Sequence, residues 1–247
     1  ESLVTFVDPA SGALRVATRS GDKTIRVWDA GTGSVLLVIN ACDYVKALAL
    51  FTDPATGAPR LACGTASRLW KRGDVRVFDP VAGGEALVVI DTRGSGVLAL
   101  EFFTDPATGA PRLACGCYDS KVRIFNPVAG GEALVVIDVG STVWALAVFT
   151  DPATGELRLA CGSTKVKIFD PVAGGSALLR LRIGDKCNFC VEAMVVFADS
   201  ATGAPRLAFC GGMCDALVRI FDPVAGGAPL AVLDAGEMVE LLAVFTD

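Results

Sequence analysis

Four cysteines form the clearest pattern for chemistry in this sequence: a Cys187-x-x-Cys190 pair, followed by Cys210-x-x-x-Cys214. Four thiolates at such spacings suit tetrahedral Zn²⁺. The alternatives are a disulfide or redox pair and simple free thiols. We expect free thiols and neither metal nor cofactor, because Cys210 lies close to a position at which cysteine recurs as a small buried residue.

Histidine is absent from all 247 residues. Its absence excludes Ser-His-Asp and Cys-His catalysis and every metal site that needs an imidazole. Among the many carboxylates, Glu101, Glu192 and Glu240 lie on predicted inner strands, where we expect a solvated lining rather than general acids. The sequence therefore predicts a protein that is not an enzyme. A carboxylate site built on Glu192 and Glu240 is kept as an alternative.

These residues are positioned by a segment that the chain repeats. FTDPATGAPRLACG occurs at residues 51–64 and again at 103–116, with variants at 149–162 and 197–211 and a looser copy from Phe6. The Asp of this segment recurs at intervals of 45 to 52 residues, which divides the chain into five periods. A repeat of this length is typical of propellers and solenoids.

Each period holds four short apolar runs, which we name strands a, b, c and d. In the third period they cover residues 97–103, 112–116, 121–125 and 133–137. The runs are rich in Val, Ile, Leu and Phe, and the intervening DPATG and DPVAGG segments suit tight hairpins. Four strands joined by three hairpins make one antiparallel sheet, and radial repetition of such sheets gives an all-β β-propeller. We expect ALVVI in strand d and VWALAVF in strand a to be buried on both faces.

The repeats resemble those of the WD-repeat family. The run from Leu113 to Asn126, LACGCYDSKVRIFN, is similar to that family's signature for strands b and c, and Trp28-Asp29 keeps its Trp-Asp pair. The other repeats carry Phe-Asp or Phe-Asn. The family commonly bonds a His to an Asp in the b–c turn. Since this chain has no His, we expect Asp22 and Asp119 to cap the local backbone instead.

We predict a single domain, residues 1–247, with five complete blades and one extra inner strand at residues 238–245. The repeats are approximately 1–40, 41–91, 92–138, 139–183 and 184–234, and a partial sixth is 235–247. Three arrangements fit the extra strand. The chain is part of a longer six- or seven-bladed ring, five blades close alone, or a partner chain completes the ring.

Composition limits the classes of function. The chain is 52% hydrophobic, but no apolar run approaches the ~20 residues that a membrane-spanning helix needs. The net charge of −5, with acids and bases interspersed, argues against a nucleic-acid-binding protein. Cysteine recurs in strand b at residues 63, 115 and 161, too far apart for disulfides between blades. Reduced thiols favour an intracellular location, either cytoplasmic or in an organelle interior.

Comparison of the repeats indicates which loops carry function. The a–b and c–d loops hardly change, whereas the d–a and b–c loops differ in every repeat, and propeller geometry places these variable loops on one face. The longest is TASRLWKRGD at residues 65–74. An aromatic beside Arg and Lys is typical of an interface. The alternatives are drift in the loops, Trp70 covering the blade edge and Trp144 plugging the central channel.

We therefore predict a non-catalytic scaffold or adaptor for protein–protein interaction, a subunit of a larger assembly that binds other proteins rather than nucleic acid, membrane or small-molecule substrates. A fragment or half-ring completed by another chain is the structural alternative. The predicted protein-binding residues are Asp43, Tyr44, Arg68, Trp70, Lys71, Arg72, Tyr118 and Trp144.

Overall fold

The computed structural model describes residues 3–181, 190–211 and 216–244. The regular secondary structure of these residues consists of β-strands. No helix occurs among them, and so no helix that could cross a membrane. Two compact units divide the chain: unit 1 is residues 1–119 and 123–134, and unit 2 is residues 120–122 and 135–247. We describe each unit by itself, and the single domain stays a prediction.

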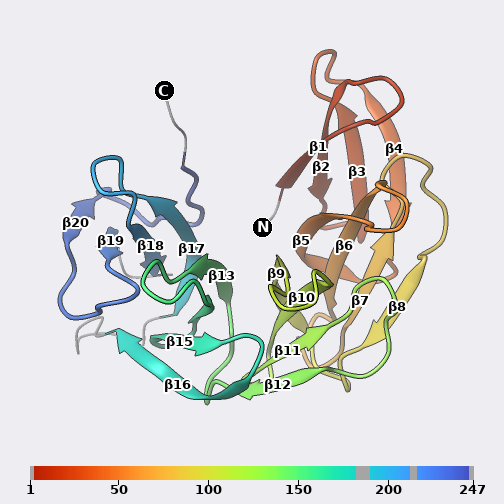
Figure 1. Cartoon of the computed structure of the whole chain (residues 1–247). Helices are drawn as coiled ribbons and strands as arrows, with labels where there is room; N and C mark the ends of the chain where they lie inside the picture. The colour runs from red at the N-terminus through yellow and green to blue at the C-terminus, as the bar shows by residue number, and fades with distance from the viewer. Residues whose placement is uncertain (1–2, 182–189, 212–215, 245–247) are drawn as a thin grey trace. The chain divides into compact units, whose positions relative to one another are not determined.

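The described residues form five four-stranded antiparallel sheets, each a meander in chain order (Figure 1). The first sheet is β1 (Leu3–Val7), β2 (Leu14–Arg19), β3 (Thr24–Asp29) and β4 (Val35–Asn40). The second is β5 (Tyr44–Thr52), β6 (Pro59–Ala66), β7 (Asp74–Phe78) and β8 (Val88–Asp91). The third is β9 (Val97–Thr104), β10 (Pro111–Cys117), β11 (Lys121–Phe125) and β12 (Val135–Asp138). The fourth is β13 (Ala145–Thr150), β14 (Leu157–Gly162), β15 (Val166–Asp170) and β16 (Gly174–Leu181).

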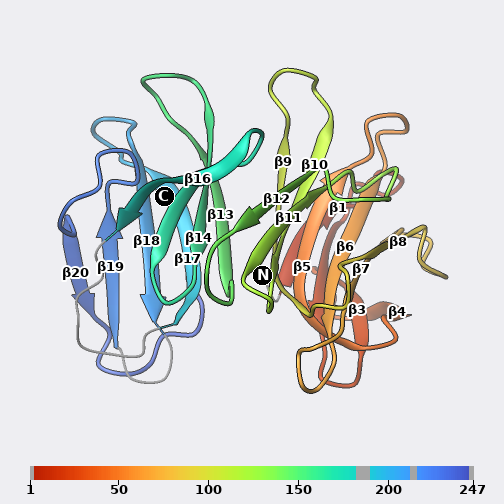
Figure 2. The same ribbon diagram turned by 90° about the horizontal axis from the view of Figure 1, so that it is seen from below.

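The fifth sheet is β17 (Val191–Ala198), β18 (Pro205–Gly211), β19 (Leu217–Phe221) and β20 (Ala231–Asp234). Its strands run side by side in Figure 2. Every sheet falls within one predicted repeat, and its strands correspond in order to a, b, c and d. The predicted fold class, an all-β β-propeller of four-stranded antiparallel blades, is confirmed.

The repeated hairpins form because their Asp residues complete the turn. In the second sheet Asp53 Oδ1 accepts a hydrogen bond from the Ala55 amide at 2.9 Å, and the Gly57 amide donates to the Asp53 carbonyl at 2.8 Å. Gly57 has a φ of 71°, a region that glycine enters without a Cβ clash. The turn sets the register in which Thr52 lies opposite Pro59.

Sheets pack through the small residues of strand b. In unit 1 a Cβ on Gly64 would lie 2.6 Å from Val97 of the next sheet, and in unit 2 a Cβ on Gly162 would lie 2.7 Å from Val191. Glycine therefore allows strand a of the following sheet to approach strand b. In β13 the inner strand is accordingly buried on both faces, as predicted for VWALAVF; Ala145, Leu146 and Ala147 are each 6% exposed. In β1, by contrast, buried and exposed residues alternate, and Leu3 and Val7 are exposed.

The outer strands differ from the prediction. Leu87 and Val89 are each 55% exposed, whereas Ile90 between the sheets is 1% exposed. ALVVI is therefore buried on one face only. The reason is that strand d is the outermost strand of its sheet, paired on one edge and packed on one side.

The extra inner strand also differs from the prediction. Residues 238–244 are not assigned to a strand, and Phe245 lies outside the described residues. Met238, Leu241 and Val244 are 49%, 60% and 47% exposed. A β-strand requires a neighbour for its backbone N–H and C=O groups, and no strand in the described part of the chain pairs with this segment.

Candidate functional site

The variable loops of unit 1 lie together at one end of its sheets. The Ala41 amide, in a d–a loop, donates to the carbonyl of Lys23 in a b–c loop at 3.0 Å. The Gly96 amide donates to the Trp70 carbonyl at 2.9 Å, and the Tyr118 amide donates to the Gly96 carbonyl at 2.9 Å. Each of these backbone hydrogen bonds joins a b–c loop to a d–a loop, as the predicted grouping of the two loop types requires.

The long loop between β6 and β7 has a defined conformation. At its base, Thr65 Oγ1 donates to Asp74 Oδ1 at 2.5 Å and accepts from the Asp74 amide at 3.0 Å. Farther along, the Ser67 amide donates to the Arg72 carbonyl at 2.7 Å, and the Trp70 amide donates to the Ser67 carbonyl at 2.7 Å. These bonds hold the loop tip in one geometry.

Trp70 lies at the tip of this loop with a φ of 58°, an uncommon backbone conformation for a bulky residue. The next sheet supports it, because a Cβ on Gly96 would lie 2.4 Å from the Trp70 carbonyl oxygen. Only glycine at position 96 allows this approach. The surrounding contacts therefore fix a backbone conformation that is unfavourable by itself, a situation common at functional sites.

The Trp70 side chain is half-buried between two polar neighbours. Its ring meets that of Tyr118 edge to face, with centroids 5.8 Å apart and planes inclined by 72°. The Lys46 ammonium lies 5.7 Å from the Trp70 ring centroid, within the range of a cation–π interaction. The Trp70 ring thus contacts Lys46 of β5 and Tyr118 of the β10–β11 loop.

Exposed basic and apolar side chains surround this aromatic pair. Leu69 is 75% exposed, and Arg68, Lys71 and Arg72 are exposed as well. None of these three cations forms an ion pair with the described residues. We call this set the basic-aromatic surface: Lys46, Arg68, Leu69, Trp70, Lys71, Arg72 and Tyr118.

Asp43 and Tyr44 form a second group at the same end of unit 1. Lys23 Nζ lies 3.5 Å from Asp43 Oδ1 and 4.9 Å from the Tyr44 ring centroid. The Asp43 carboxylate also accepts a hydrogen bond from the Tyr44 amide at 2.9 Å. The structure thus joins these two predicted residues through Lys23, which the sequence had not indicated.

Trp144 belongs to unit 2. It is half-buried just before β13, and its amide donates to the Gly162 carbonyl at 2.9 Å. Its side chain hydrogen-bonds to Cys190, which lowers the pKa of that thiol, but burial has the larger effect and raises it. Trp144 therefore attaches the segment before β13 to the segment before β17.

The possible zinc site lies partly outside the described residues, since Cys187 and Cys214 are not among them. The Cys210 thiol contacts backbone oxygens, at 3.1 Å from Val239 and 3.9 Å from Ala193. No group of three potential metal ligands occurs in the described part of the chain. The seven cysteines in this part of the chain are free, and the interpretation as simple thiols stays a prediction because Cys187 and Cys214 lie outside it.

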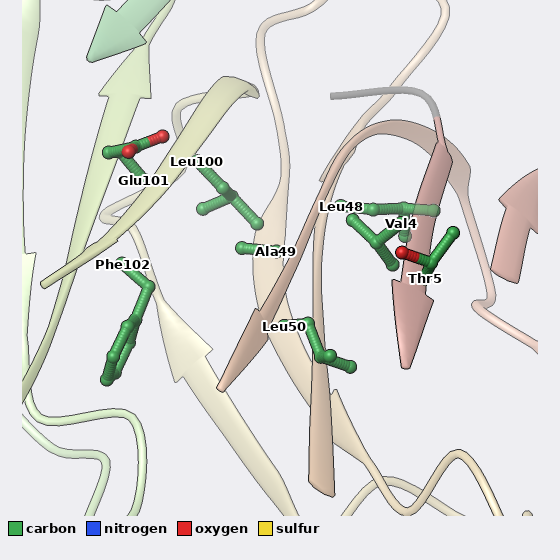
Figure 3. A pocket seen from close by; sticks show the side chains of 8 residues that line it. All are labelled: Val4, Thr5, Leu48, Ala49, Leu50, Leu100, Glu101 and Phe102. Atoms are coloured by element: carbon green, nitrogen blue, oxygen red, sulfur yellow. The ribbon is translucent and has the colours of Figure 1, made fainter. Parts of the chain in front are cut away.

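A cavity of about 320 Å³ lies in unit 1 along the inner strands β1, β5 and β9 (Figure 3). Val4, Leu48, Leu50 and Leu100 supply most of its apolar lining, and Glu101 is its one charged side chain. This composition offers no pair of carboxylates for general acid–base chemistry. Polar and apolar atoms both line the cavity, and Glu101 supplies its one carboxylate.

The sequence interpretation missed an arginine network on the constant loops. The strand-b arginines 15, 60, 112, 158 and 206 each form an ion pair with the hairpin Asp of their own sheet, at 3.0 to 3.6 Å. Arg60 also reaches Asp79, the Asp of the Phe-Asp pair, at 3.2 Å. The recurrence of Arg between DPATG and LACG was the signal that could have revealed it.

The b–c turn aspartates divide between two roles. Asp22 Oδ1 accepts from the Thr24 amide at 3.1 Å, which confirms the predicted backbone cap. Hydrogen bonds from Thr24 and Arg26 hold the pKa of Asp22 well below its usual value. Asp119 instead accepts two hydrogen bonds from the Arg123 guanidinium, at 3.0 and 2.6 Å. The side-chain partner of Asp119 in this turn is therefore an arginine four residues farther along the chain.

No protein-family model matches the sequence. No curated protein matches it either. In contrast, 1068 chains of solved structures match the fold. One belongs to a structure described as the crystal structure of the mitotic checkpoint complex, with a TM-score of 0.66 and 20% sequence identity. The match covers 93% of this chain but 65% of that one. At this identity the likeness supports the fold alone.

Proposed function

We propose that this chain is a non-catalytic scaffold of the WD-repeat type, which binds other proteins as a subunit or adaptor of a multi-subunit assembly. The basic-aromatic surface is the observation that carries the proposal. It combines an edge-to-face Trp70–Tyr118 pair with the 75% exposed Leu69 and three cations that have no ion-pair partner among the described residues.

This combination fits protein recognition for energetic reasons. Aromatic and Arg side chains are enriched at interfaces, where Trp and Tyr anchors contribute most of the affinity. The loop that presents them is already held by Thr65, Asp74 and Gly96, so little conformational entropy is lost when a partner binds. The chain as a whole carries a charge of −5, so the surface is a basic region on an acidic protein. We infer an acidic protein partner rather than a nucleic acid.

Membership of the WD-repeat family is supported by the repeats and by their sheets. Trp28, of the one Trp-Asp pair, donates from its indole Nε1 to Thr18 Oγ1 at 2.9 Å. In the second sheet, Asp79 of the Phe-Asp pair accepts from Arg60. In both sheets a residue of the Trp-Asp or Phe-Asp pair thus hydrogen-bonds to a side chain of strand b, and no histidine takes part.

Asp43, Tyr44 and Trp144 are proposed as further contact residues. The Asp43–Lys23–Tyr44 group extends the contact area of unit 1. Trp144 is a separate candidate in unit 2. The seven cysteines in the described part of the chain are free, which supports a reducing intracellular compartment, cytoplasmic or within an organelle.

The enzyme alternative has less support. Glu192 and Glu240 are both exposed, whereas a carboxylic acid that acts as a general acid near neutral pH needs an apolar surrounding. We propose no small-molecule substrate, catalytic residue or cofactor for this chain.

Affinity capture with charge-reversal variants tests the proposal. We expect the triple variant Arg68→Glu/Lys71→Glu/Arg72→Glu to lose specific protein partners that the unaltered chain retains. Because these three side chains are exposed, the variant should fold normally. The matched control is Val128→Ala, an exposed residue of a constant c–d turn, which should retain every partner. Equal partner sets for all three proteins would contradict the assignment of this surface.

A further inference from the structure

A second cavity of unit 1 lies at the junction of the second and third sheets, at the end that carries the constant loops. Its volume is about 200 Å³. The residues that matter for its chemistry are Asp53 and Arg60, the aliphatic Val77, Leu87 and Val88 of the second sheet, and Pro127 in the c–d turn of the third. The cavity shares no residue with the basic-aromatic surface.

The junction of the first and second sheets contains an equivalent but smaller cavity, of about 60 Å³. Seven of the eight lining positions carry the same residue type in both cavities. The position that differs is Val88, which lies opposite Val77 of β7; its equivalent is Leu37, which lies opposite Val27 of β3. Since the other lining residues match, the extra methylene group of Leu37 accounts for the smaller volume.

The charged pair in the larger cavity keeps capacity for further hydrogen bonds. Arg60 Nη1 donates to the Pro59 carbonyl at 3.1 Å and to Asp79 Oδ2 at 3.2 Å, and Nη2 donates to Asp53 Oδ2 at 3.4 Å. The Nε–H and the second N–H of Nη2 form no hydrogen bond with the described residues. Asp53 Oδ1 accepts from the Ala55 amide and retains a lone pair. The pair thus offers a donor beside an acceptor.

We propose that the larger cavity binds a leucine-sized aliphatic side chain of a peptide, whose backbone hydrogen-bonds to Arg60 and Asp53. A peptide group has one N–H donor and one C=O acceptor, which match a carboxylate beside a guanidinium. The charges of the pair offset each other, so the site favours a neutral peptide group over an ion. Sites for drug-sized ligands start at about 300 Å³, so this smaller volume suits a single side chain.

The smaller cavity is the comparison within the chain. It has the same kind of ion pair, between Arg15 and Asp8 at 3.2 Å, but Leu37 takes up the space that a ligand side chain needs. Protein interiors are close-packed, so one methylene group changes what fits. We therefore expect binding at the junction of the second and third sheets and none at the junction of the first and second.

Methyl NMR spectra of the full chain, with isotope-labelled Leu and Val, test the proposal. The probe is N-acetyl-leucine N-methylamide, whose side chain lies between two peptide groups. We expect saturable shifts of the Leu87 and Val88 methyl signals at millimolar concentrations, and none at Leu36 and Leu37. N-acetyl-glycine N-methylamide lacks the side chain and isoamyl alcohol lacks the peptide groups, so each should bind about tenfold more weakly or less.

The exchange of a valine for leucine provides matched variants. Val88→Leu reproduces the first junction, where Leu37 is accommodated, so the variant should fold. It should weaken binding by about tenfold or more, because an extra methylene group overpacks the site. Val89→Leu makes the same exchange at a 55% exposed residue that does not line the cavity, and should leave the affinity unchanged. Val128 also lines the cavity but is 38% exposed, so Val128→Ala should weaken binding much less than Val88→Leu does.

The reverse exchange, Leu37→Val, should open the first cavity and add saturable shifts at Leu36. The triple charge-reversal variant of the basic-aromatic surface should bind the probe like the unaltered chain, so this site and the proposed function can fail separately. The proposal is overturned if no saturable shift occurs at Leu87, if the glycine probe binds as tightly as the leucine probe, or if Val89→Leu acts like Val88→Leu. A Leu37→Val variant without new shifts would also contradict it.

Discussion

The rings of Trp70 and Tyr118 meet edge to face at 5.8 Å, although one residue lies in the β6–β7 loop of the second sheet and the other in the β10–β11 loop of the third. Their backbones are also linked, because the Gly96 amide donates to the Trp70 carbonyl and the Gly96 carbonyl accepts from the Tyr118 amide. The contact joins two sheets of unit 1 at the end where the variable loops lie.

This contact should stabilise the protein. An edge-to-face aromatic pair contributes about 0.5–1.5 kcal/mol beyond the burial of its area. We predict a coupling energy of that size in the cycle formed by Trp70→Ala, Tyr118→Ala and the double variant. Urea unfolding measures it. Strictly additive effects of the two substitutions would show that the rings do not interact.

Gly96 should not tolerate a side chain. A Cβ there would meet the Trp70 carbonyl oxygen at 2.4 Å and the Ala66 Cβ at 2.9 Å. Forcing extra atoms into such a contact destabilises by about 1–3 kcal/mol, so Gly96→Ala should lower the urea midpoint accordingly. Gly21→Ala is the control, since nothing lies within 4 Å of its Cβ position. A normal midpoint for Gly96→Ala would contradict the close approach.

The Arg–Asp pairs at the constant loops should contribute more to the stability of the fold than exposed arginines do. Arg60 is 15% exposed and bonded to both Asp53 and Asp79, so its removal leaves two carboxylates without their cation. We predict that Arg60→Ala lowers the thermal midpoint clearly, whereas Arg68→Ala changes it little. Differential scanning calorimetry gives the comparison. Similar midpoints for the two variants would exclude a structural role of the pair.

Stability should depend on pH through the hairpin aspartates. A hydrogen bond from Ser11, supported by the Ala10 amide and Arg15, lowers the pKa of Asp8 from 3.8 to about 2. The pKa values of Asp53, Asp105 and Asp199 are lowered too, mainly by hydrogen bonds within the hairpins. A carboxyl whose folded pKa is depressed stabilises the protein above its unfolded pKa and loses that contribution as pH falls toward its folded pKa.

We therefore expect the urea midpoint to fall between about pH 4 and pH 2, the window between the unfolded and folded pKa values of Asp8. Asp8→Asn should make this decline shallower. Glu85→Gln alters an exposed carboxyl outside the hairpin network and should leave the profile unchanged. An unchanged slope for Asp8→Asn would contradict the assignment.

Thiol labelling should separate the cysteines by position. Burial raises the pKa of Cys63 to about 12 and that of Cys117 to about 11, so both are un-ionised and inaccessible in the native state. Cys42 is exposed. Iodoacetamide at pH 8 should modify Cys42 in the folded protein and reach Cys63 and Cys117 only after denaturation, as peptide mass spectrometry can determine. Native labelling of Cys63 would contradict the buried strand-b position.

Local sequence patterns were enough to predict the strands, the hairpins and the blade repeat. DPATG closes a turn through hydrogen bonds between neighbouring residues, and apolar runs of similar length form strands wherever they recur. Both features depend on residues close together in the sequence, so they can be predicted from it. Four features became visible only in the tertiary structure. Two are side-chain groupings: Lys46 with Trp70 and Tyr118, and Arg60 with Asp53 and Asp79. The other two are exposed surfaces, namely the outer face of strand d and the segment at residues 238–244. Each of these features depends on which segments far apart in the sequence pack together and on which face then remains exposed. Local sequence patterns do not specify these long-range contacts.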